Sequence, residues 1–183
     1  MPEVNGSAQH SENAIAILPD SAERLHRAES ITTSHVLMSL GSGLIPITGF
    51  DLLAGLTIQL TLLKRLSTLY GVPYSKNLGK SIVLSFLSTV GGLEAGQTIA
   101  LSFVKLIPFV GTAVGVVSMS AILGAFTFAL GKVFTQHLES GGTFLDFDPE
   151  VYRNYFREMF GRGKSVVADL KKNEASPVAA ETL

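Results

Sequence analysis

One short phrase occurs twice in this chain of 183 residues and constrains its fold more than any other feature. It reads Leu-Ile-Pro-Ile-Thr-Gly at residues 44–49 and Leu-Ile-Pro-Phe-Val-Gly at residues 106–111. Proline and glycine break helices, and each copy lies between apolar segments that are too long for strands. The repeat therefore predicts two helical hairpins, whose tips are formed by Ile45, Pro46, Gly49, Ile107, Pro108 and Gly111.

Breaks and caps along the chain place the four mainly apolar helices of these hairpins at residues 22–40, 50–70, 76–104 and 112–137. A C-terminal amphipathic helix is predicted to begin at Asp148-Pro149-Glu150, because aspartate caps helices and proline suits the first helical position. A second short helix is expected at residues 165–172. The fold class is therefore all-α. We divide the chain into a disordered N-terminal tail (1–19), a double-hairpin membrane domain (20–142), a C-terminal amphipathic helical segment (143–172) and a disordered tail (173–183).

The distribution of charge favours a membrane for the hairpins. Only eight charged residues lie between Ile31 and Phe134, and residues 107–130 carry none. About 20 apolar residues cross a bilayer, so the last hairpin helix has the length to cross, whereas the first hairpin either dips into the bilayer or packs on the second. Of the 14 Lys and Arg residues, only Lys105 lies near a tip. Since cytoplasmic segments carry the positive excess, we expect the tips to enter from the cytoplasm, with both termini cytoplasmic.

Two kinds of residue within the apolar zone are candidates for a specific role. Small residues let helices approach closely in lipid, and we expect packing of the third hairpin helix on the fourth through Gly92, Gly96, Gly115 and Gly124. Asp51 and Glu94 are the acids of this zone. An ionisable group in hydrocarbon is costly and suggests a path for ions or protons. The structural alternatives are a helix cap at Asp51 and a helix break at Glu94.

The C-terminal amphipathic helix combines aromatic and basic side chains. Such a combination suits a membrane interface, and an equal alternative is docking on a partner or on the base of the bundle. The residues concerned are Tyr152, Arg153, Tyr155, Phe156, Arg157 and Phe160.

Several classes of function are excluded by what the chain lacks. It has no cysteine, and a net charge of -1 gives no basic field for nucleic acid. Gly79-Lys80-Ser81 and Gly163-Lys164-Ser165 resemble the end of a phosphate-binding loop, but Tyr74 and Glu158 occupy the positions where that loop needs its first glycine. His35 and His137 lack metal-ligand spacing and are predicted to be structural. We therefore expect no enzyme, cofactor or metal site.

The segment from Lys105 through Gly142, with Phe128-Ala129-Leu130-Gly131-Lys132 at its centre, resembles a bacterial membrane domain of unknown function that is associated with small GTPases (the domain-of-unknown-function 697 family). The resemblance covers about residues 35–160. It implies a helical, membrane-associated protein of the bacterial inner membrane, with a separate small GTPase as a partner. The family has no agreed activity, so the resemblance implies no catalytic residue.

The leading functional hypothesis is a non-enzymatic helical-hairpin protein that acts as a membrane anchor, scaffold or assembly partner. Its expected partners are the lipid bilayer, a second copy of the chain and a small GTPase. One alternative is a small channel or transport subunit that uses Asp51 or Glu94. A second alternative is a soluble helical oligomer or interaction module.

Overall fold

A computed structural model describes residues 20–42, 50–94 and 113–175. Within these ranges, the side chains of residues 42, 50–54, 91–94, 113–119 and 173–175 are outside the description. The described residues form helices without any strand, which confirms the all-α prediction. The helices are α2 (Ser21–Ser42), α3 (Phe50–Leu69), α4 (Lys76–Glu94), α6 (Ala113–Glu139) and α7 (Pro149–Ala175).

The signals that predicted the helix ends have the expected local chemistry. At the start of α7, Asp148 Oδ1 accepts a hydrogen bond of 2.9 Å from the backbone N–H of Glu150. At the end of α6, Gly141 has φ of 82°, and Gly142 N–H donates to the carbonyl of His137 at 3.0 Å. This pattern closes a helix by satisfying its last carbonyls, and it needs a left-handed residue that glycine supplies without strain.

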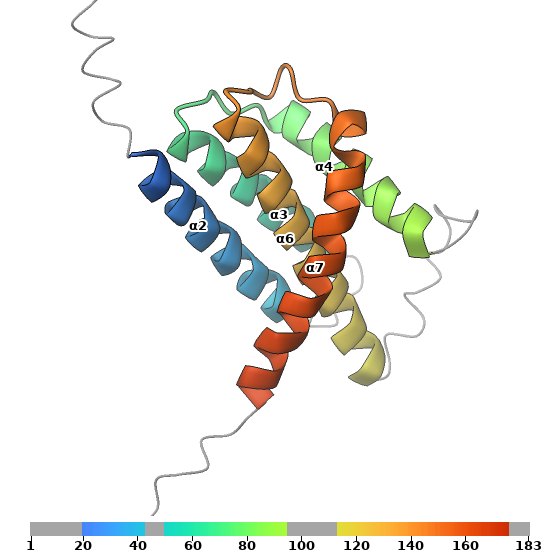
Figure 1. Ribbon diagram of the computed structural model, residues 1–183. Helices are drawn as coiled ribbons and strands as arrows, with labels where there is room; N and C mark the ends of the chain where they lie inside the picture. Colours follow the sequence, from blue (N-terminus) through green and yellow to red (C-terminus); the bar gives the residue numbers. More distant parts are fainter. Residues whose placement is uncertain (1–19, 43–49, 95–112, 176–183) are drawn as a thin grey trace, which may run out of the picture.

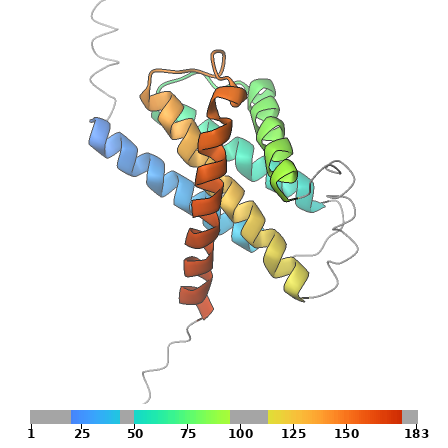
Figure 2. The ribbon, with the colours of Figure 1, turned by 45° about the vertical axis from the view of Figure 1, so that its right-hand side comes forward.

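Helix α6 lies at the centre of the bundle (Figure 1). It packs along α7 on one side and along α2 on another, and it also contacts α3. Helix α3 packs on α2 and α4, and α4 packs on α7. Turning the molecule shows that α7 crosses α6 near its middle (Figure 2).

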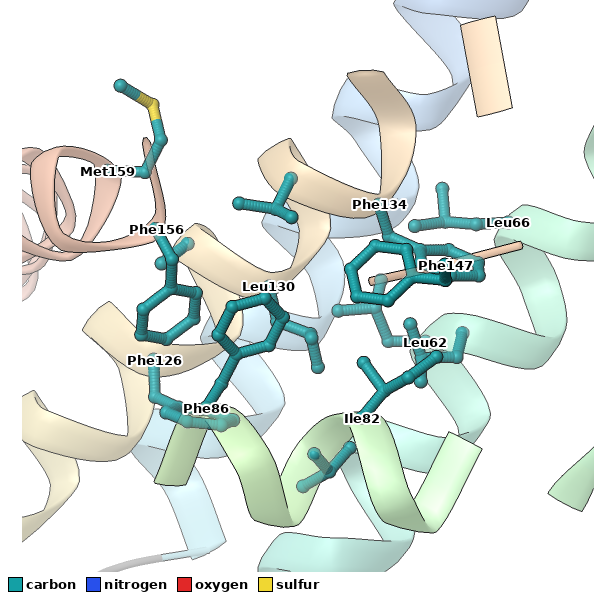
Figure 3. Close-up of a cluster of buried hydrophobic side chains, with 14 of the residues drawn as sticks. Leu62, Leu66, Ile82, Phe86, Phe126, Leu130, Phe134, Phe147, Phe156 and Met159 are labelled. Atoms are coloured by element: carbon teal, nitrogen blue, oxygen red, sulfur yellow. The ribbon is translucent and has the colours of Figure 1, made fainter. Parts of the chain in front are cut away.

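An aromatic cluster forms the core between α4, α6 and α7 (Figure 3). Phe156 of α7 stacks on Phe86 of α4 at 4.3 Å between ring centroids, and its edge meets Phe126 of α6 at 5.4 Å. Such ring pairs stabilise by about 0.5–1.5 kcal/mol beyond their buried area. Over the described residues, Phe156 of α7 thus contacts both α4 and α6. The predicted packing of the third hairpin helix on the fourth stays a prediction, because Gly92, Gly96 and Gly115 lie where their surroundings are not described.

The last part of the chain also differs from the prediction, because α7 is one continuous helix of 27 residues rather than two short ones. Gly163 does not break it. A Cβ atom at Gly163 would lie 2.8 Å from the carbonyl oxygen of Ala125 and 3.0 Å from its Cα. Gly163 is therefore the point at which the backbones of α6 and α7 approach each other.

The continuity of α7 separates the two ends of the described chain. Helix α2 begins beside the end of α6, where Arg24 Nε lies 3.4 Å from Glu139 Oε1. Helix α7 runs back along α6 and reaches its first half, where Lys171 Nζ donates to Ser120 Oγ at 2.9 Å. The described chain thus begins and ends at opposite ends of α6 (Figure 1).

Candidate functional site

The predicted hairpin tips Ile45, Pro46, Gly49, Ile107, Pro108 and Gly111 lie outside the described residues. The helix ends that flank them are described. The ends of α2 and α4 and the starts of α3 and α6 all lie below the α3–α4 and α6–α7 connections in Figure 1. The described helix ends that flank the two copies therefore lie away from those two connections, and the hairpin interpretation itself stays a prediction.

The structure describes only part of the apolar zone in which the sequence predicted membrane-crossing helices. Over the residues that the structure describes, no helix is at once long enough and apolar enough to cross a bilayer. The uncharged stretch at residues 107–130 begins outside the described part, and Gly96 is also outside it. Asp51 lies in the first turn of α3 and Glu94 is the last residue of α4, but their side chains are not described, nor are the surroundings of Gly92 and Gly115.

Gly124 is the predicted packing glycine whose surroundings are described. A Cβ atom at Gly124 would lie 2.9 Å from Val167 Cγ2 and 3.0 Å from Leu40 Cδ2. The residue thus brings α7 and α2 onto α6, rather than α4. Val36, Leu40 and Val167 form a small apolar cluster around this point.

The aromatic residues predicted for an interface are part of the core. Phe156 and Phe160 have exposed fractions of 0% and 2%, and Tyr152 and Tyr155 are half-buried. Tyr152 donates its hydroxyl to His137 Nδ1 at 3.1 Å, while His137 Nε2 donates to the carbonyl of Thr143 at 2.8 Å. Of the two interpretations of this helix, the structure therefore favours docking on the bundle. His137 is structural, because it ties the α6–α7 connection to both helices.

Four cations of α7 lie along a different line on the helix from its buried aromatic residues. Arg153, Arg157, Lys164 and Lys171 are spaced by four, seven and seven residues, so they lie on one flank of the helix. We call this set the basic flank. Arg157 and Lys164 are exposed, and Lys164 Nζ lies 4.9 Å from the centroid of the Phe160 ring. Arg153 pairs with Glu150 near the start of the helix.

A buried polar layer joins α2, α3 and α6. Thr127 Oγ1 lies 2.7 Å from Ser39 Oγ, and Gln59 Nε2 donates to the same Thr127 oxygen at 2.8 Å. His35 Nδ1 donates to the carbonyl of Ile31 at 2.7 Å, whereas His35 Nε2 and Gln59 Oε1 are buried without a hydrogen-bond partner. Burial lowers the pKa of His35, because a charged imidazole is poorly solvated there.

The ends of α2, α3 and α6 are held by a second polar contact. Tyr70 donates its hydroxyl to Glu139 Oε1 at 2.5 Å, and the Arg24 guanidinium lies 5.3 Å from the centroid of the Tyr70 ring. Burial, together with the Glu139 carboxylate, raises the pKa of Tyr70. Within the described residues, His, Asp and Glu form no group of three that is placed to hold a metal ion.

Comparison with known proteins decides the family. The chain is 38% identical to magnetosome membrane protein 22 of Magnetospirillum gryphiswaldense over 161 residues, which cover 87% of this chain and 83% of that protein. This chain belongs to the family of magnetosome membrane protein 22. No protein-family model and no solved structure matches it. The resemblance to the GTPase-associated domain therefore stays a prediction.

In this member of the magnetosome membrane protein 22 family, two features escaped sequence reasoning. The basic flank carried a signal, since its four cations keep one helical phase from Arg153 to Lys171. That signal was lost when the helix was expected to stop before residue 165. The polar layer carried no comparable signal, because Ser39, Gln59 and Thr127 come from three helices whose rotation the sequence does not reveal.

Proposed function

We propose that this protein is a non-enzymatic, membrane-associated helical protein that anchors or scaffolds an assembly on a bacterial membrane. The observation that carries the proposal is the 38% sequence identity between this chain and a relative that is named as a magnetosome membrane protein. That name favours the magnetosome membrane as the location of this chain over the inner membrane that the sequence suggested. In this proposal the two Leu-Ile-Pro-x-x-Gly segments enter the bilayer and the helical bundle remains at its surface.

The bundle has the properties that such a surface-bound unit needs. Its largest buried side chains, among them Phe86, Phe134 and Phe156, are covered by other parts of the same chain. The described helices therefore have a core that needs no lipid. The two segments proposed to insert are nearly uncharged, since residues 43–49 carry no charge and residues 95–112 carry only Lys105.

The absence of cysteine from the chain makes the test direct. Single cysteines at Thr48 and Thr112 report on the proposed inserting segments, and one at Asn77, an exposed residue in the first turn of α4, is the control. With protein bound to vesicles, a water-soluble maleimide should label the Asn77 variant and spare the other two. All three should be labelled in denaturant.

The result that overturns the proposal is equally clear. Membrane fractions from expressing cells should retain the protein after carbonate extraction. Full release by carbonate, together with equal labelling of the three cysteines on vesicles, would show that neither segment inserts into the bilayer. A channel is not favoured by any described contact, and the predicted small GTPase partner rests on the resemblance alone.

A further inference from the structure

Helix α7 carries more cations than acids from Arg157 to its end. Between Arg157 and Ala175 it has five cations and three acids. The cations are Arg157, Arg162, Lys164, Lys171 and Lys172, and the acids are Glu158, Asp169 and Glu174. Arg162 pairs with Glu158 at 2.8 Å, and Lys172 lies 4.0 Å from Asp169. Arg157, Lys164 and Lys171 belong to the basic flank on the other side of the helix.

Two stretches of the described chain that neighbour this part of α7 carry no charge. The second half of α2 (31–42) and the first two-thirds of α6 (113–131) contain no charged residue. Both lie next to the second half of α7, because Gly124 contacts Leu40 and Val167. On the outer side of α2, Leu37 and Met38 are 42% and 46% exposed. Cations beside exposed apolar side chains are typical of protein surfaces that meet a membrane.

The same end of the molecule contains two of the four helix ends that flank the Leu-Ile-Pro-x-x-Gly segments. The end of α2, the start of α6 and the end of α7 all lie in the lower part of both ribbon views (Figures 1 and 2). The hydrogen bond from Lys171 to Ser120 fixes the last turns of α7 beside the first turns of α6. The last turns of α7 therefore lie near the start of α6, the helix end that follows the second of these segments in the sequence.

We propose that the basic flank of α7 binds the headgroups of anionic phospholipids in that membrane. This inference rests on the proposed function and adds the lipid class that the surface selects. Clusters of Lys and Arg beside a membrane bind anionic lipids, each near cation strengthening binding about fivefold. The aromatic face of α7 is used by the core, since Phe156 is fully buried. The selectivity of α7 is thus electrostatic.

Vesicle flotation with the full chain tests the inference. The probes are vesicles of phosphatidylcholine alone and vesicles in which part of it is replaced by phosphatidylglycerol. The test variant is Arg157→Gln with Lys164→Gln. The matched control is Lys76→Gln with Lys80→Gln, which makes the same change of charge at two exposed lysines of α4, at the other end of the bundle. A further variant, Arg157→Lys with Lys164→Arg, keeps the charge and changes the shape.

Wild type, control and charge-keeping variant should bind the phosphatidylglycerol vesicles alike, and more tightly than phosphatidylcholine vesicles. The test variant should lose about fivefold in partitioning for each of the two cations that lies at the surface, and so about 25-fold where α7 lies along the membrane. Added salt should weaken wild-type binding. Equal loss in the test and control variants, or equal wild-type binding to both vesicles, overturns the inference and leaves membrane association standing. Failure of wild type to float with either vesicle overturns the proposed function as well.

Discussion

Replacing Gly163 with alanine should weaken the contact between α6 and α7, while the same replacement at Gly161 should strengthen the fold. Both glycines lie inside α7, where alanine is favoured over glycine by about 1 kcal/mol. A Cβ atom at Gly161 would meet nothing within 4 Å. At Gly163 it would lie 2.8 Å from Ala125 O, 3.0 Å from Ala125 Cα and 3.2 Å from Phe128 Cβ.

The two variants separate the steric effect from the helix-forming tendency. Gly161→Ala should raise the free energy of unfolding by about 0.5–1 kcal/mol. Gly163→Ala gains the same amount but must move two backbones apart, and overpacking costs typically about 1–3 kcal/mol. Because the helix term is common to both, the difference between the variants is the steric cost itself. We expect Gly163→Ala to be less stable than Gly161→Ala by about 1–3 kcal/mol.

Urea unfolding followed by far-ultraviolet circular dichroism measures this difference under one set of buffer conditions. In thermal unfolding, about 1 kcal/mol corresponds to a change in Tm of roughly 2–4 °C for a chain of this size. If both variants gain the same stability, α7 does not lie against Ala125, and its continuous path along α6 is wrong. If Gly161→Ala lowered the stability, a neighbour would have to lie close to Gly161, which contradicts the open space seen there.

Three further predictions concern the polar contacts between helices. Burial depresses the pKa of His35 below 6.5, so this side chain stays neutral in the folded protein while it gains a proton in the unfolded chain. Stability should therefore fall as the pH falls through and below 6.5. In His35→Gln, the urea concentration at the unfolding midpoint should depend less on pH. Thr127→Val leaves the amide of Gln59 without its acceptor and should lower the free energy of unfolding by about 1–3 kcal/mol, measured by urea unfolding with Thr68→Val, an exposed threonine, as the control. Tyr70→Phe removes the hydrogen bond to Glu139 and should lower the free energy of unfolding by about 0.5–1.5 kcal/mol; the effect should be absent in a Glu139→Ala background, because alanine offers no acceptor.

Local chemistry explains why most helix boundaries were predictable. The cap at Asp148-Pro149 and the stop at Gly141-Gly142 act within a few residues of the chain, and they place the start of α7 and the end of α6 within two residues of the prediction. The start of α3 at Phe50 was also predicted correctly. These signals need no knowledge of what each helix packs against.

Contacts between distant segments explain what was missed. In the sequence, Gly161 and Gly163 look like a break, and only the nearness of Ala125 gives Gly163 a reason to lie inside a helix. Once the helix is taken as broken, the phase that aligns Arg157 with Lys164 and Lys171 is lost. The contact of Gly163 with Ala125 thus explains why α7 is continuous, and only a continuous helix aligns the four cations on one flank.

The length of the basic flank also determines how many of its cations can act on the membrane surface at once. Arg153 and Lys171 are 18 residues apart, or about 27 Å along a helix, whereas the screening length at physiological salt is about 8 Å. All four cations therefore act together only if α7 lies along the surface. If the bundle stands on the ends that lead to the two Leu-Ile-Pro-x-x-Gly segments, Lys171→Gln should weaken binding to phosphatidylglycerol vesicles more than Arg153→Gln does. Equal losses would instead place α7 flat on the membrane, and the flotation assay distinguishes the two orientations.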